Sequence, residues 1–136
     1  MILVDTGPLV ALFDPRDDSH ERAKATLASL ADNLVTTIPV LTEAFHLLGP
    51  ANRGAQALRT FITQRGLAVW WLAERSLARA FRLMAAYGDH PMDLADASLV
   101  TAAETLRTTK VFTIDRRDFL AYRAKIGRSQ RAFTLV

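Results

Sequence analysis

The chain contains no cysteine, which excludes disulfides, thiolate zinc sites and cysteine nucleophiles. It also lacks an uninterrupted apolar run near 18 residues, the length that a transmembrane helix needs. The apolar N-terminus has no basic leader and is broken by Asp5, Gly7 and Pro8, which argues against a signal peptide. These absences favour a soluble protein of the cytoplasm without membrane attachment.

Several catalytic motifs are missing as well. The sequence has no glycine-rich phosphate loop, no GxSxG elbow and no HExxH helix. Its three histidines, His20, His46 and His90, stand in unrelated segments. Because acid and base catalysis by a histidine pair requires close mutual geometry, this spacing does not indicate such a pair. His46 lies three residues from Glu43 on the same predicted helix and could lie near a site there, with an ordinary core or surface histidine as the alternative.

The composition predicts one α/β domain over residues 1–136. Half of the residues are apolar, 23% are charged, and the formal net charge is +3 with an isoelectric point near 9.8. The charges are segregated: residues 107–131 carry eight basic and two acidic side chains, whereas residues 1–106 carry nine basic and twelve acidic ones. A polyanionic partner fits this distribution, which does not single one out.

Apolar and β-branched runs alternate with helical periodicity along the chain, as in sheets with parallel strands. The runs predict strands at residues 2–4, 34–38, 67–72, 110–114 and 132–136. The periodic segments predict helices at residues 17–30, 39–48, 56–64, 75–87, 93–106 and 118–125. The result is a short, mostly parallel sheet of about five strands, with ligands expected beyond the carboxyl ends of the strands.

Acidic residues gather at that predicted edge. Asp5 and Asp115 end two strands, Glu43 lies one turn into the helix that follows the second strand, and Asp93 and Asp96 open the helix before residue 110. Singly, each acid has an ordinary alternative as a helix cap or turn residue. Together, converging carboxylates would repel one another unless a cation neutralises them, and an all-oxygen set suits Mg²⁺ or Mn²⁺.

Four segments in this order resemble the motifs of PIN-domain ribonucleases, and more closely those of VapC-type toxins. The segments read VDTGPLVALFD, IPVLTEAFHLLG, PMDLADASLVTAAE and TIDRRDFLAYR. The resemblance implies a three-layer α/β/α fold and a catalytic quartet of Asp5, Glu43, Asp96 and Asp115. It also implies metal binding by Asp5, Asp96 and Asp115, with Asp93 as an auxiliary acid. Hydroxyls that support these acids would belong to Thr6 and Thr113.

The resemblance further implies hydrolysis of RNA by metal-activated water, which leaves 5′-phosphate and 3′-hydroxyl ends. The resemblance leaves open whether one or two metal ions bind, and whether Asp93 or Asp118 contacts an ion directly. A small cognate antitoxin and a homodimer are implied as partners. A PIN nuclease without a toxin role, or an RNA-binding module without activity, remain the alternatives.

Basic and aromatic residues supply candidate RNA contacts. Arg116 and Arg117 directly follow Asp115 and are expected to bind substrate phosphates. Four further basic residues extend the positive segment, with a merely solvated surface as the alternative: Arg123, Lys125, Arg128 and Arg131. Trp70 and Trp71 are candidates for base stacking, although adjacent strand residues face opposite ways, so at least one is expected in the core.

Overall fold

The computed structural model describes all 136 residues. Its strands are β1 (Ile2–Val4), β2 (Leu34–Thr37), β3 (Ala68–Trp70), β4 (Lys110–Phe112), β5 (Arg123–Ile126), β6 (Ser129–Ala132) and β7 (Thr134–Leu135). Its helices are α1 (Thr6–Phe13), α2 (His20–Ser29), α3 (Ile38–Leu48), α4 (Arg53–Thr63), α5 (Glu74–Ala86), α6 (Leu94–Leu106) and α7 (Arg116–Ala121).

Five strands form one sheet in the order β3-β2-β1-β4-β7, and every neighbouring pair is parallel. The predicted α/β class with a five-stranded parallel sheet is therefore confirmed. β5 and β6 form a separate antiparallel hairpin. Strand β1 is wholly buried, as expected for a central parallel strand that is covered on both faces.

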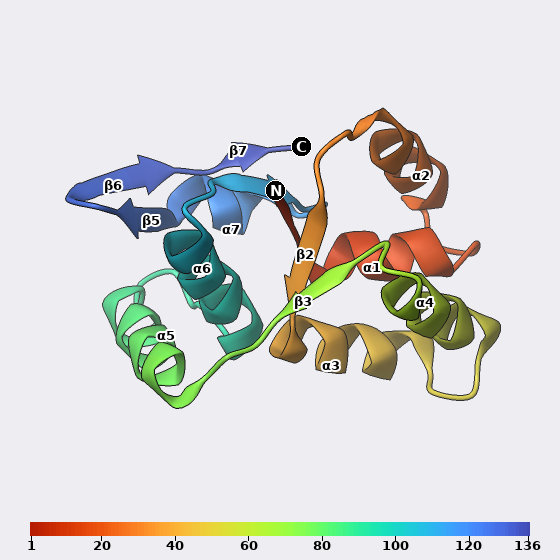
Figure 1. The fold of residues 1–136 in the computed structure, drawn as a ribbon, viewed down its shortest axis with the longest axis horizontal. Helices are drawn as coiled ribbons and strands as arrows, with labels where there is room; N and C mark the ends of the chain where they lie inside the picture. Colours follow the sequence, from red (N-terminus) through yellow and green to blue (C-terminus); the bar gives the residue numbers. More distant parts are fainter.

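The chain first moves outward from β1 to β2 and β3, then returns to the other side of β1 as β4. Because parallel crossovers are right-handed, this reversal sends the two groups of helices to opposite faces. Figure 1 shows α1 to α4 on one side of the sheet and α5 with α6 on the other. The reversal falls between β1 and β4, where this type of sheet binds its ligands.

The core consists of 31 buried apolar residues and includes most of α6. The predicted inward stripe of that helix, Ala97, Val100 and Ala103, is fully buried. No helix of the structure is both long enough and apolar enough to pass through a lipid bilayer.

Three segments differ from their predictions. Helix α1 was not predicted, because Gly7 and Pro8 break the sequence pattern; both lie in the first helical turn, where Pro needs no N–H partner. The predicted helix 118–125 is wrong beyond Ala121, since Tyr122 leaves the helix with an extended backbone and Arg123–Ile126 is strand β5. The predicted strand 132–136 is reduced to β7, and its first residue belongs to β6.

Candidate active site

Asp5 stands where β1 ends and caps the N-terminus of α1. Its Oδ1 accepts the Thr6 backbone N–H at 2.7 Å, and its Oδ2 accepts the Thr113 hydroxyl at 2.9 Å. Thr113 follows β4, so this bond joins the two strands that flank the reversal of strand order. Burial raises the pKa of Asp5 to about 6, with further contributions from the charges of Glu43 and Asp93.

Helix α6 brings the next two acids to the same edge of the sheet. The hydroxyls of Thr37, at the end of β2, and Ser98, in the second turn of α6, lie 2.6 Å apart in the core. This contact holds the start of α6 beside the carboxyl ends of the strands. Asp93 caps the helix, and its Oδ1 accepts the Asp96 backbone N–H at 2.8 Å.

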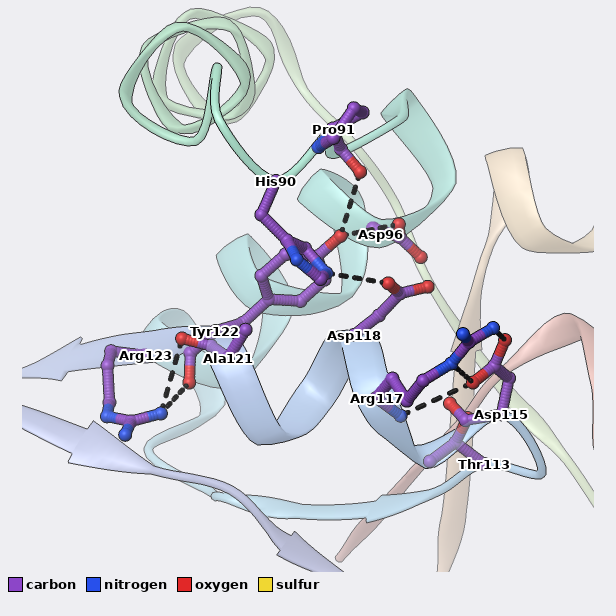
Figure 2. A network of polar contacts seen from close by, with 10 residues as sticks. All are labelled: His90, Pro91, Asp96, Thr113, Asp115, Arg117, Asp118, Ala121, Tyr122 and Arg123. Atoms are coloured by element: carbon purple, nitrogen blue, oxygen red, sulfur yellow. Dashed lines mark hydrogen bonds and ion pairs between the residues drawn. The ribbon is translucent and has the colours of Figure 1, made fainter.

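Asp96 is the second strongly perturbed acid. Burial raises its pKa to about 7, and the charges of Asp93, Asp5 and Asp118 act in the same direction. The Tyr122 hydroxyl donates to Oδ2 of Asp96 at 3.0 Å (Figure 2). Burial and the Asp96 charge raise the pKa of Tyr122 in turn, so the phenol keeps the proton that it donates.

Glu43 lies on the exposed side of α3 and faces the start of α6 across a groove of about 540 Å³. Partial burial and the charge of Asp93 raise its pKa. His46, one turn along α3, lines the same groove, together with the apolar Ile38 and Leu94. The expected neighbourhood of Glu43 and His46 is therefore present in the structure.

The predicted strand 110–114 is shorter in the structure, because β4 ends at Phe112, and Asp115 follows three residues later as the cap of α7. Its carboxylate is paired with a base. The Arg117 guanidinium approaches Oδ2 at 3.3 Å and Oδ1 at 3.4 Å, and these contacts lower the pKa of Asp115. Its side chain is 60% exposed. Figure 2 shows the pair at the start of α7, away from the bond between Tyr122 and Asp96.

Asp118, one turn along α7, acts on Asp96 through its charge, whereas Asp115 is not among the charges that raise the pKa of Asp96. The Asp118 charge contributes to the raised pKa of Asp96, and Oδ1 of Asp118 is 2.8 Å from Nε2 of His90. Sequence reasoning left Asp118 open and missed Tyr122 and His90, because their place depends on how α7 packs on α6. The remaining histidine, His20, contacts the carbonyl of Ala11 on α1, so the three histidines lie in separate places.

Arg116 forms no ion pair and lines a small pocket with Arg22 and Thr113, next to the hydroxyl that holds Asp5. Trp70 is the last residue of β3 and Trp71 follows it, two strands away from β1. Trp70 packs partly against the core, as one of the pair was expected to do, and Trp71 is 70% exposed.

The PIN domain is the protein family whose sequence model matches residues 2–125. The chain belongs to the PIN-domain family. Among curated relatives, Ribonuclease VapC26 of Mycobacterium tuberculosis is 31% identical over 125 residues, which cover 90% of this chain and 92% of that protein. The resemblance drawn from the four sequence motifs is therefore confirmed.

Solved structures share the fold of this PIN domain. VapC20 of M. tuberculosis, described as a toxin that cleaves the sarcin–ricin loop, aligns with a TM-score of 0.81 and 20% identity over 96% of this chain and 100% of that one. A toxin–antitoxin complex from Klebsiella pneumoniae aligns with a TM-score of 0.67 and 21% identity over 89% and 92% of the two chains.

The acids of this PIN domain fit a hydrated Mg²⁺ or Mn²⁺ ion better than a fully enclosed one. No group of three or more carboxylate or imidazole side chains is arranged to hold an ion by itself. Mg²⁺ commonly takes one or two carboxylates and keeps several waters. Asp5 and Asp96 supply two such carboxylates, and the buried Thr6 hydroxyl beside Asp5 has no hydrogen-bond partner within the protein.

Proposed function

We propose that this chain is an endoribonuclease that depends on Mg²⁺ or Mn²⁺ and serves as the toxin of a toxin–antitoxin pair. Family membership makes it a ribonuclease, a hydrolase that acts on RNA. The observation that carries the metal dependence is the pair of partly buried carboxyls, Asp5 and Asp96, whose pKa values are raised to about 6 and about 7. A divalent cation would relieve the repulsion that contributes to both shifts.

In this proposal Asp5 and Asp96 hold the ion directly, and Asp93 supports the site as the cap that fixes the first turn of α6. Asp115 joins them once substrate phosphate draws Arg117 away from its carboxylate. A bound ion polarises the scissile phosphate and acidifies a water molecule. Glu43, whose pKa is raised, is placed across the groove to accept the proton of the attacking water.

Arg116 and Arg117 bind the phosphates that flank the cleaved bond, since guanidinium groups pair well with phosphate oxygens. The attacking group is water and not the ribose 2′-hydroxyl. The products therefore carry 5′-phosphate and 3′-hydroxyl ends. The cytoplasm is the proposed location, since RNA is the proposed substrate.

The test combines end mapping with one substitution. Wild-type protein with Mn²⁺ should yield 5′-phosphate ends that a 5′-phosphate-dependent exonuclease degrades, and EDTA should stop cleavage. Asp96→Ala should lose cleavage and keep RNA binding. Cyclic 2′,3′-phosphate ends, or full activity in EDTA, would contradict the metal mechanism, whereas RNA binding without cleavage under any condition would favour a binding module.

The proposed partner is a small antitoxin that covers the acidic edge, and the proposed assembly is a homodimer. Support comes from the K. pneumoniae toxin–antitoxin complex and from VapBC2 of Rickettsia felis, solved with a promoter DNA fragment, which share the fold at 21% and 16% identity. A reading frame for a small antitoxin is expected immediately upstream of the gene, and co-expression of that antitoxin should suppress RNA cleavage. Sedimentation of the free toxin should give twice the chain mass.

A further inference from the structure

Each of the two half-buried carboxylates of the site, Asp5 and Asp96, accepts a hydrogen bond from one hydroxyl of a neighbouring element. Thr113, after β4, donates to Asp5 at 2.9 Å, and Tyr122, after α7, donates to Asp96 at 3.0 Å. The family resemblance drew attention to Thr113, whereas Tyr122, although it lies within the segment TIDRRDFLAYR, was not singled out as a functional residue. Asp5 and Asp96, which repel one another, are thus each held by a hydroxyl donor, and the two donors come from different parts of the chain.

The place of the Tyr122 hydroxyl is fixed by the ring that carries it. The side chain is fully buried. The rings of Tyr87, His90 and Phe119 meet it edge-on, with centroids at 5.2, 5.6 and 5.4 Å. Such edge-to-face contacts favour one ring orientation. The hydroxyl therefore cannot swing away from Asp96 without repacking this aromatic cluster.

The hydroxyl has one proton and two acceptors within reach. Oδ2 of Asp96 is at 3.0 Å and the carbonyl of Pro91 is at 3.3 Å. The shorter contact to a charged acceptor is the stronger one. It occupies Oδ2 and leaves Oδ1, which accepts no hydrogen bond in the structure, available for an outside ligand.

Resting on the proposed function, we propose that Tyr122 is a positioning residue for the metal ion at Asp5 and Asp96. Its hydroxyl fixes the plane of the Asp96 carboxylate, so that the free Oδ1 is already directed for ligation when the ion arrives. Outer hydrogen bonds of this kind orient metal ligands, and their loss typically weakens metal binding by 10- to 100-fold. The role differs from catalysis, because Tyr122 acts only through Asp96.

The test is Tyr122→Phe, which removes the hydroxyl and keeps the ring. Tyr87→Phe is the matched control, because Tyr87 belongs to the same cluster and its hydroxyl accepts a backbone N–H from Arg123 at 2.9 Å without touching an acid. Mn²⁺ affinity of the RNA-free proteins is measured by electron paramagnetic resonance. We expect Tyr122→Phe to bind Mn²⁺ about tenfold more weakly than wild type, and Tyr87→Phe to match wild type within about twofold.

The dependence of cleavage on Mn²⁺ concentration is a second measurement. It would not change if the Tyr122 hydroxyl only stabilised the fold. Cleavage by Tyr122→Phe should fall at limiting Mn²⁺ and recover when Mn²⁺ is raised, with the KM for RNA unchanged. Equal or tighter Mn²⁺ binding by Tyr122→Phe would overturn the role of Tyr122 while leaving the proposed function intact. Absence of Mn²⁺ binding by the wild type would instead overturn the proposed function, and this inference with it.

The unmodified protein provides an independent check if Tyr122→Phe proves poorly folded. The chain has only two tyrosines, Tyr87 and Tyr122, so ¹³C-labelled tyrosine gives two sets of ring signals in NMR spectra. Titration with Mg²⁺ should shift the Tyr122 signals with the same midpoint as metal binding, and shift those of Tyr87 less. Tyr122 signals that do not respond to saturating Mg²⁺ would contradict the inference.

Discussion

At the residue scale, Asp5 and Asp96 combine burial with support from specific donors. Each accepts a hydroxyl, and Asp5 also accepts a backbone N–H. These bonds favour the ionised forms, yet desolvation outweighs them, and both pKa values remain raised. Asp115 shows the opposite balance, because exposure and Arg117 keep its pKa low. The free protein therefore tends to protonate the two acids that the proposed site uses most.

This balance predicts how the stability of the metal-free protein depends on pH. The folded pKa values of Asp5 and Asp96, at about 6 and about 7, lie above the usual value of 3.8 for an aspartic acid. The folded state therefore binds more protons than the unfolded state between about pH 4 and pH 7. The free energy of unfolding should fall as pH rises from about 4 to 7, by about 3 kcal/mol for the shift of Asp5 alone. Urea unfolding in EDTA across this range measures the slope.

A flatter slope is expected for Asp96→Asn, because one of the titrating groups is then absent. Asp18→Asn, at an exposed loop position, serves as the control for exchanging an acid for an amide. A free energy of unfolding that rises between pH 5 and 7 would contradict the raised pKa values.

Metal addition should reverse this loss of stability. At pH 7.5, Mn²⁺ at about 100 times its Kd should stabilise the wild type by about 3 kcal/mol, since only the folded state presents the paired carboxylates. The melting temperature then rises by several degrees. Asp5→Asn should lose the rise, because one of the two proposed ligands is gone. An unchanged wild-type melting curve over a wide range of Mn²⁺ would count against the site.

At the scale of elements, the sequence predicted a strand or helix correctly where its apolar residues followed one clear pattern. Strand β1 was predicted from its continuous apolar run, and α6 from its spacing of Ala97, Val100 and Ala103. The hairpin of β5 and β6 has mixed polar and apolar positions and an exposed second strand, so no apolar pattern marked it. The early end of α7 was missed for the same reason, and with it the contact between Tyr122 and Asp96.

The placing of the acids was predictable to a similar degree. Strand ends position Asp5 and Asp115 through the topology alone, which the alternation of elements revealed. Whether a side chain then faces a neighbouring acid or a base depends on tertiary packing. The pairing of Asp115 with Arg117 and the approach of Asp118 to Asp96 are of this second kind. A single sequence carries no periodic signal for such contacts.

The junction of α1 and α4 offers a prediction about element packing. Alanine at Gly54 would gain about 1 kcal/mol in helix propensity. However, its Cβ would meet the Phe13 carbonyl oxygen at less than contact distance and lie 3.2 Å from Cδ2 of Leu48. Since backbone cannot yield cheaply, Gly54→Ala should be destabilised by about 1 to 3 kcal/mol. Chemical denaturation measures the change.

Gly88→Ala is the matched control. A Cβ at Gly88 would meet only the Ala85 carbonyl oxygen, at an ordinary 3.7 Å. Its stability should stay within about 0.5 kcal/mol of wild type. Equal stability of Gly54→Ala and wild type would mean that α1 and α4 are less closely packed than the structure has them.

At the scale of the whole molecule, the basic residues of segment 107–131 divide into two groups. Arg116 and Arg117 open α7 beside the acidic edge. The hairpin with Arg128 and Arg131 lies near the other end of α6, where the Lys125 backbone N–H donates to Glu104 at 2.8 Å (Figure 1). Eight residues of helix separate Glu104 from Asp96, a rise of about 12 Å. That span exceeds the screening length of about 8 Å at physiological salt.

The two groups should therefore differ in how they bind RNA. In an Asp96→Asn background, which prevents cleavage, Arg116→Ala should weaken binding of a short single-stranded RNA several-fold. It should also reduce the slope of log K against log salt by about 0.7, the value for one phosphate contact to a single strand. Arg128→Ala should leave the slope unchanged, and any small loss of affinity should vanish at high salt. Fluorescence anisotropy at several salt concentrations measures both quantities. An equal change of slope for Arg116→Ala and Arg128→Ala would instead mean that the RNA path extends along α6 to the hairpin, and that the basic segment binds as one continuous surface.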